Sequence, residues 1–216
     1  MRDCTETRLA VIETCRWLVK EKFTFATYGN ISVRLDDGNI LITPTRVDYE
    51  DMTPEDLVVL APDGTVVSGH RLATSERELH RGILNARPDV GAIIHAHSPY
   101  AMAAAATGEG IPPISEEVCQ MIGGAIPITS RFVPSEKHLE LGEEATRSIG
   151  DKNALLIRNH GPVCCGRTLE EAKVCCQVVE KAAQIYLLIR NGSCVPVEEP
   201  WVTAGREYFL HGYGKT

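Results

Sequence analysis

The sequence GAIIHAHSP, residues 91–99, is the stretch around which the rest of the chain is organised. Its apolar run is bounded by glycine and proline, which predicts a short buried strand. Side chains two residues apart on a strand point to the same face, so we expect His95 and His97 to lie side by side. Two neutral imidazoles at that spacing suit a divalent transition metal such as zinc, which takes three or four ligands. The stretch therefore predicts part of a metal site.

Two residues outside this strand are candidates for the remaining ligands. His160 ends a second apolar run at a Gly-Pro turn, where its side chain can face a cleft. Glu76 opens a predicted helix, and a carboxylate near a cation can act as a ligand or as a general base. Each has a simpler interpretation, since buried histidines are more often core residues and acidic residues complement helix N-termini. The combination favours a metal site, and three histidine ligands would leave a position open for catalysis.

Length and composition are typical of one soluble globular domain. The chain has 216 residues, of which 44% are hydrophobic and 24% charged, and we expect residues 1–216 to form a single domain. No apolar run approaches the roughly 20 residues that a membrane span needs. The N-terminus passes at once into an amphipathic pattern rather than a signal peptide, so we expect a cytoplasmic protein with no membrane partner.

Charge and cysteine content narrow the functional classes further. The net charge is −7 and there is no basic tract, which argues against nucleic acid as the main partner. The eight cysteines include no Cys-x-x-Cys pair, so we expect reduced, mostly buried thiols rather than disulfides or a zinc-thiolate site.

Hydrophobic periodicity and turn signals predict both hairpins and helices between the strands. The expected helices cover residues 5–22, 75–86, 100–106, 135–149 and 168–190, with capping-box patterns at Ser75 and Thr168. Besides the histidine strand, the expected strands cover residues 31–35, 39–43, 57–60, 65–67, 128–133, 154–158 and 163–165. Residues 107–127 are expected to be a loop, and residues 193–216 a tail. This order predicts an α/β fold with a central mixed, largely antiparallel sheet flanked by helices.

A second group of polar residues lies at predicted turns and at a helix start. Hydroxyl and amide side chains in such places, together with backbone N–H groups, can hold a phosphate. Simple turn and cap chemistry explains each of them alone: Thr27, Asn30, Thr45, Thr74 and Ser75. The other histidines have no comparable context and are expected to be surface or packing residues: His70, His80, His138 and His211.

Six short motifs together resemble those of the class II aldolase and adducin-head family. They stand in the same order, at compatible spacing, over nearly the full length: GNISV (29–33), LITPT (41–45), TSE (74–76), HAH (95–97), NHG (159–161) and GYG (212–214). The resemblance implies a zinc-dependent lyase that cleaves a ketose 1-phosphate, such as fuculose 1-phosphate, to dihydroxyacetone phosphate and an aldehyde. It implies a metal-stabilised enediolate, one Zn²⁺ per subunit, with Mn²⁺ or Co²⁺ as alternatives, and a homotetramer with active sites between subunits.

The resemblance also implies roles for individual residues. His95, His97 and His160 would be metal ligands, and Glu76 the resting fourth ligand and proton-transfer group. Tyr213, in a C-terminal tail over residues 193–216 that reaches the active site, would assist at the aldehyde end. The phosphate would be bound by Asn30, Thr45, Thr74 and Ser75, with Thr27 supporting them.

Two departures from the family pattern leave the substrate open. Arg46 stands where a glycine is expected, and Glu116 where an aromatic tyrosine from the neighbouring subunit is expected. A carboxylate and a phenol differ greatly in acidity, so proton delivery at that end differs. Alternatives on the same fold are a pentulose-5-phosphate 4-epimerase, a thiosugar-phosphate dehydratase and a sugar-acid phosphate decarboxylase. A non-catalytic adducin-like module would lack the histidines, and a cupin site would continue in strands.

Overall fold

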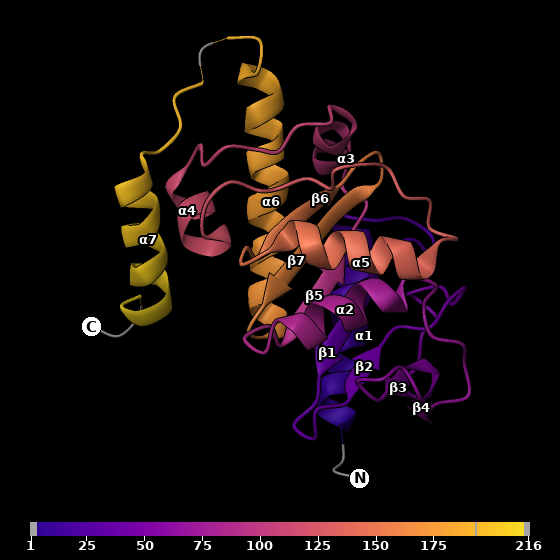
Figure 1. The fold of residues 1–216 in the computed structure, drawn as a ribbon. Coiled ribbons are helices and arrows are strands. Elements are labelled where there is room, and N and C mark those ends of the chain that lie inside the picture. Colours follow the sequence, from indigo (N-terminus) through magenta and orange to yellow (C-terminus); the bar gives the residue numbers. More distant parts are fainter. Residues whose placement is uncertain (1–3, 193, 214–216) are drawn as a thin grey trace.

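The computed structural model describes residues 4–192 and 194–213 (Figure 1). In this part of the chain the helices are α1 (Thr5–Lys20), the 3₁₀ helix η1 (Pro54–Asp56), α2 (Arg77–Ala86), α3 (Pro99–Ala106), α4 (Glu116–Ile122), α5 (His138–Ile149), α6 (Leu169–Ile189) and α7 (Glu199–His211). The strands are β1 (Asn30–Arg34), β2 (Ile40–Ile42), β3 (Val58–Leu60), β4 (Val66–Ser68), β5 (Ala92–His95), β6 (Ala154–Ile157) and β7 (Gly161–Gly166).

These strands form one sheet in the order β4-β3-β2-β1-β5-β7-β6, and each pair of neighbours is antiparallel. The predicted fold class is confirmed, and the strand pairing is antiparallel rather than mixed. The register places Asn30 of β1 opposite His95 of β5, and His95 opposite Val163 of β7. The sheet therefore brings Asn30 beside His95, although the two are far apart in the sequence. That residues 1–216 form a single domain stays a prediction.

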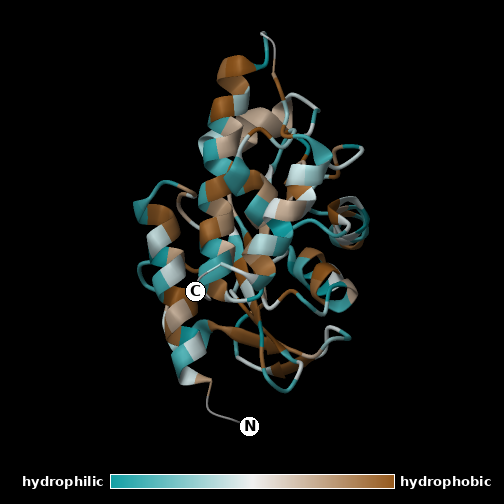
Figure 2. Cartoon of the chain, turned by 90° about the vertical axis from the view of Figure 1, so that its left-hand side faces the viewer, coloured by the Kyte–Doolittle hydropathy of each residue, from teal (hydrophilic) through white to brown (hydrophobic). Residues whose placement is uncertain are grey.

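Helices cover both faces of the sheet, with α2 and α5 in front and α6 behind in Figure 1. In β5, Ile93 belongs to the apolar cluster that includes residues of α2 and α5, whereas Ile94 belongs to the cluster that includes residues of α1, α3 and α6. Figure 2 shows strands that are largely brown, whereas the helices alternate between brown and teal residues. Because side chains alternate along a strand, His95 shares the face of Ile93, which α2 covers.

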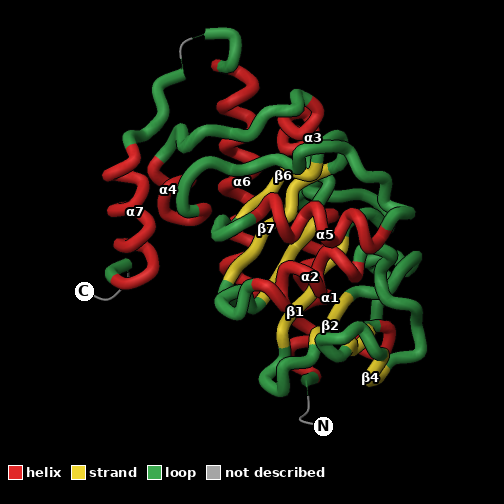
Figure 3. The backbone as a smooth tube through the Cα atoms, in the orientation of Figure 1, coloured by secondary structure: helices red, strands yellow, loops and turns green. Residues whose placement is uncertain are grey.

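The predicted loop over residues 107–127 contains a helix, α4, which the sequence analysis missed. The Ser115 hydroxyl accepts a hydrogen bond from the Val118 N–H at its start, and Gly123, with φ of 86°, ends it in the left-handed conformation. Both signals are readable in the sequence, but the surrounding prolines and glycines obscured them. The helix buries Val118 and Met121 and packs against α7 (Figure 3).

Three further predictions of local structure were wrong. Residues 128–133 form no strand: Ile128 makes one isolated bridge to β6, and the Ser130 N–H donates to the Glu144 carboxylate instead of to a neighbouring strand. The capping box at Ser75 does not form, because α2 begins at Arg77 and the Glu78 carboxylate accepts from Arg81. The tail over residues 193–216 includes the helix α7, which has a proline in its first turn.

Other expectations agree with the described structure. Thr168 caps α6 by accepting a hydrogen bond from the Glu171 N–H. The cysteines are free, and most of them are buried. Among the residues that the structure describes, no helix has both the length and the apolar character required to cross a bilayer.

Candidate metal centre and active site

His95 ends strand β5 and is fully buried. Its Nδ1 lies 2.9 Å from the carbonyl oxygen of Pro162, which can only accept a hydrogen bond. The Nδ1 atom therefore carries the proton, and the lone pair of Nε2 is free to bind a cation. His97 follows two residues later, and its backbone N–H donates to the Phe23 carbonyl at 2.9 Å.

His160 reaches the same place from the hairpin that joins β6 to β7. Asn159 adopts a left-handed conformation with φ of 56°, which asparagine tolerates better than most residues. The tight turn leaves His160 immediately before Gly161, the first residue of β7. A Cβ atom at Gly161 would collide with the Ala96 carbonyl oxygen. Only glycine therefore allows the start of β7 to approach the segment after β5 this closely.

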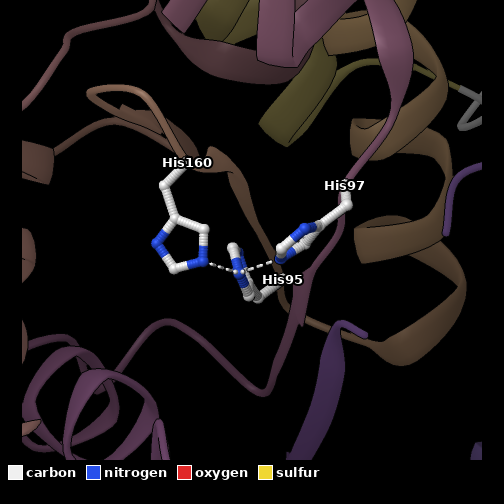
Figure 4. Close-up of side chains that lie close together, drawn as sticks. All are labelled: His95, His97 and His160. Carbon is white, nitrogen blue, oxygen red and sulfur yellow. Dashed lines mark hydrogen bonds between the residues drawn. The ribbon is translucent and has the colours of Figure 1, made fainter. Parts of the chain in front are cut away.

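The three imidazoles converge on one small volume (Figure 4). The Nε2 atom of His95 lies 3.1 Å from that of His97 and 3.3 Å from that of His160. Burial, with a smaller contribution from the neighbouring histidines, lowers the pKa of His95 to about 3 and that of His97 to about 3. Both rings are therefore neutral near pH 7.

Glu76 completes the cluster from the start of α2, where it is the N-cap residue. Its Oε2 lies 3.4 Å from His95 Nε2, and its Oε1 lies 3.3 Å from His160 Nε2. Oε2 accepts a hydrogen bond of 2.7 Å from the Asn30 amide, but Oε1 is buried with no hydrogen-bond partner. An unpartnered buried carboxylate oxygen is costly unless something binds it.

These residues fit a divalent cation. The ring nitrogens of His95, His97 and His160 lie within 4.8 Å of one another. Neutral imidazole nitrogens pointed at a common centre repel through their lone pairs unless a proton or a cation lies between them. Three imidazoles and one carboxylate are a donor set that zinc and related metals accept. The predicted ligand set thus meets in space, with an orphaned carboxylate oxygen beside it.

His80 is a member of this site that the sequence analysis missed. It is fully buried on α2, and its Nε2 lies 2.5 Å from Asn30 Oδ1. Its Nδ1 lies 2.7 Å from the Ser32 hydroxyl. Its position four residues after Glu76, on the same helix face, was the available signal. The expectation of a packing role was incomplete, because His80 bonds the residue that bonds Glu76.

The predicted phosphate residues come from neighbouring segments. The Thr74 N–H donates to the Thr43 carbonyl and the Thr45 N–H to the Leu72 carbonyl, which joins the segments of Thr45 and Thr74. Thr74 is buried and its hydroxyl accepts from the Glu76 N–H at 3.3 Å, whereas Ser75 is exposed. Asn30 is joined to Glu76 directly, and Thr27 is exposed in the loop before β1.

An open pocket of about 610 Å³ lies beside His97. Its lining is mainly apolar, with one cationic residue: Val19, Lys22, Thr24, Phe25, Ala26, His97, Pro99 and Met102. The Tyr28 ring lies 5.3 Å from the His97 ring. The pocket leaves one side of His97 accessible to a small molecule.

Comparison with known proteins identifies the family. A family model described as the Class II Aldolase and Adducin N-terminal domain matches residues 9–187. The chain belongs to the class II aldolase and adducin family. Family membership and the histidine cluster are consistent with a metal-dependent lyase.

Similar class II aldolases carry different substrate names. L-fuculose phosphate aldolase of Escherichia coli K12 is 32% identical over 177 residues, covering 82% of this chain and 80% of that protein. The 5-methylthioribulose-1-phosphate/5-deoxyribulose-1-phosphate aldolase of Rhodospirillum rubrum is 32% identical over 201 residues, covering 93% of this chain and 86% of that protein. A solved structure of L-fuculose 1-phosphate aldolase superposes with a TM-score of 0.90 at 29% identity, covering 95% of this chain and 97% of that one.

The two residues that depart from the class II aldolase pattern, and the tail residue Tyr213, lie outside the histidine cluster within one subunit. Arg46 is exposed, with φ of 59°, in the turn after Thr45. Glu116 is exposed at the start of α4, where its carboxylate accepts from Gln120 at 2.9 Å. The exposed Tyr213 ring lies 6.0 Å from the Tyr208 ring, near the end of α7. Their roles stay predictions.

Proposed function

We propose that this protein is a metal-dependent aldolase that cleaves a ketose 1-phosphate to dihydroxyacetone phosphate and an aldehyde. The observation that carries the proposal is the buried Oε1 of Glu76, which has no hydrogen-bond partner and lies 3.3 Å from His160 Nε2 beside three converging imidazoles. A carboxylate held in this way can contact a cation and exchange a proton with a substrate. The similar proteins named above are sugar-phosphate aldolases, which favours cleavage over the other reactions of the fold.

His95, His97 and His160 would hold the metal, which we propose to be Zn²⁺, with Mn²⁺ or Co²⁺ as alternatives. When bound, such a cation supplies Lewis-acid stabilisation of the negative charge that develops on the ketone oxygen. Glu76 Oε1 would be the fourth ligand at rest. With substrate present it would carry a proton to the carbon that is left when the carbon–carbon bond breaks.

The phosphate would lie at the start of α2, where Thr74 and Ser75 precede the helix and Thr45 comes from the neighbouring segment. One N–H of the Asn30 amide is used by Glu76, which leaves the second for a phosphate oxygen. Thr27 would support this site from the loop before β1. Such a site fixes the sugar relative to the metal, which is its main contribution to the rate.

The remaining proposals concern the assembly. Tyr213 would reach the aldehyde end of a neighbouring subunit's site in a homotetramer, with Glu116 and Arg46 as further substrate contacts. A cytoplasmic location also stays a prediction. The alternative function is another phosphosugar reaction on the same fold: 4-epimerisation, dehydration or decarboxylation. The exposed Arg46 favours the last, since a guanidinium can pair with a sugar-acid carboxylate.

The test is a substrate panel on purified protein with measured metal content. Ketose 1-phosphates, including fuculose 1-phosphate and 5-deoxyribulose 1-phosphate, are assayed for release of dihydroxyacetone phosphate, and pentulose 5-phosphates and sugar-acid phosphates for the alternatives. We expect release of dihydroxyacetone phosphate that a chelator abolishes and zinc restores. If only a pentulose 5-phosphate or a sugar-acid phosphate is converted, the proposed aldolase activity is wrong and the corresponding alternative reaction takes its place.

Glu76→Gln separates the two roles of that residue. Because three histidines remain, the variant should keep its zinc, while loss of proton transfer lowers kcat by roughly 10²- to 10⁴-fold. Metal analysis and steady-state kinetics measure both. If the variant turns over as fast as the parent protein, Glu76 is not the proton-transfer group.

A further inference from the structure

A chain of three hydrogen bonds runs through the buried layer between α2 and β1. The Ser32 hydroxyl lies 2.7 Å from His80 Nδ1, His80 Nε2 lies 2.5 Å from Asn30 Oδ1, and Asn30 Nδ2 lies 2.7 Å from Glu76 Oε2. All four side chains are buried. These hydrogen bonds connect the proposed catalytic carboxylate to His80, which the sequence analysis expected to be only a surface or packing residue.

The chemistry of the four side chains allows only one assignment of donors and acceptors to these three hydrogen bonds. A carboxylate oxygen accepts, so the Asn30 nitrogen must face Glu76 and the Asn30 oxygen must face His80. That oxygen also only accepts, so His80 carries its proton on Nε2. Burial lowers the pKa of His80 to about 3, so the ring is neutral and Nδ1 accepts from the Ser32 hydroxyl. Each of these donors and acceptors is then satisfied.

We propose that His80 is a positioning residue which, by donating from Nε2 to Asn30, holds the Glu76 carboxylate with Oε2 occupied and Oε1 free toward the histidines. The inference rests on the proposed function, in which Glu76 is the fourth ligand and proton carrier. The terminal torsion of a glutamate is soft, so without a fixed donor the two oxygens can exchange places or turn away from the metal.

The fold explains why the position needs a histidine. Glu76 and His80 are four residues apart on α2, and Asn30 is fixed opposite His95 by the β1–β5 register. The bridge therefore ties the helix that carries the carboxylate to the sheet that carries a ligand. A neutral imidazole is rigid, and it offers a donor on one edge and an acceptor on the other.

The test compares His80→Gln with His80→Leu. Glutamine can place an amide N–H near the position of Nε2, whereas leucine fills the space without donating. We expect His80→Leu to weaken zinc affinity and to lower kcat by roughly 10- to 100-fold each, with KM within about threefold, as is usual for residues that orient metal ligands. His80→Gln should stay within about threefold of the parent in zinc affinity. Equal losses in both variants, or none in His80→Leu, would overturn the proposal.

Zinc affinity is measured by competition with a fluorescent chelator, so this readout needs no substrate. Glu144→Gln is the matched control, because Glu144 is a buried carboxylate that accepts from Ser130 and Ser148 in a separate network. It should lower stability without changing zinc affinity. If the substrate panel fails but the histidine variants differ in zinc affinity as expected, the proposed function is wrong and the positioning role stands.

Two further measurements keep the proposal testable if His80→Leu does not fold. Long-range ¹H–¹⁵N correlation on histidine-labelled protein should show His80 as the Nε2–H tautomer, and the Nδ1–H tautomer would contradict the bonding direction. In a double-mutant cycle, His80→Ala, which removes the donor, and Asn30→Ala should be non-additive in zinc affinity, because His80 acts through Asn30. Additive losses would show that the two residues act separately.

Discussion

Gly161 lies where the two histidine-bearing segments pack tightly against each other. It begins β7 directly after His160, and a Cβ atom there would collide with the Ala96 carbonyl oxygen and lie 3.5 Å from His95 Cε1. Ala96 lies between His95 and His97, so any side chain at residue 161 displaces the segment that carries these two histidines. The backbone here is constrained by close packing rather than by an unusual φ.

We expect Gly161→Ala to lower the free energy of unfolding by about 1 to 3 kcal/mol, as overpacking of a tight site usually does. Because the strain falls on the ligands, zinc affinity should fall as well. Urea denaturation and chelator competition measure the two effects. Gly192→Ala is the control, since a Cβ there lies 3.5 Å from the Ile189 carbonyl, an ordinary contact. A Gly161→Ala protein with unchanged zinc affinity would show that the strands can separate without moving the histidines.

At the scale of elements, α6 supports the helix that follows His95 and His97. Helix α3 begins with Pro99, and its N-cap residue Ser98 makes no capping hydrogen bond. The backbone N–H groups of Tyr100 and Ala101 donate instead to the Glu180 carboxylate on α6, each at 2.9 Å. A carboxylate at a helix N-terminus also interacts favourably with the helix dipole. A contact from a distant helix thus replaces the local cap and fixes the segment just after His97.

Glu180→Gln should destabilise the protein by about 1 kcal/mol, since the neutral amide loses the charge and keeps a single acceptor. Thermal and urea unfolding of the zinc-loaded protein measure this change. Glu143→Gln, an exposed position on α5, should change stability by less than about 0.5 kcal/mol. Equal stability of the two variants would mean that α3 does not depend on Glu180.

At the scale of the whole molecule, no hydrogen bond, ion pair or ring contact joins the C-terminal segment to the histidines within the described part of one subunit. Helix α7 packs against α4, and the exposed Tyr213 ring lies near Tyr208 and Phe209 of its own helix. A role for Tyr213 at the site therefore requires a second subunit, as in the proposed homotetramer. The prediction that Tyr213 in the tail reaches the active site thus depends on the prediction of a homotetramer.

If Tyr213 transfers a proton at the aldehyde end, removing residues 212–216 should lower kcat by about 10²-fold or more and leave the unfolding midpoint nearly unchanged. Light scattering should give a mass near four subunits for both proteins. Mixed oligomers of truncated and Glu76→Gln subunits should regain activity, because one partner supplies Glu76 and the other Tyr213. A truncation that changes neither turnover nor stability would remove Tyr213 from the mechanism.

The sequence by itself determined the features that depend on local chemistry. The buried strand that ends at His95 and the cap at Thr168 are set by neighbouring residues, and the structure confirmed both. The order of the six motifs likewise identified the family correctly. The expected Gly-Pro turn was displaced, because the turn covers residues 158–160 and Gly161 and Pro162 begin β7. Helix α4 had readable caps, but a helix of one or two turns owes its stability mainly to packing, here against α7.

Only the tertiary structure decided how those local pieces meet. Strand order put β1 beside β5 and hence Asn30 beside His95, and strand order depends on non-local burial that no short window contains. The same packing buried His80 between Ser32 and Asn30 and left one oxygen of Glu76 without a partner. Hydrogen bonds between residues some 50 positions apart exist only once the sheet has formed, which is why the histidine cluster was predictable from the sequence and the bonds that support Glu76 were not.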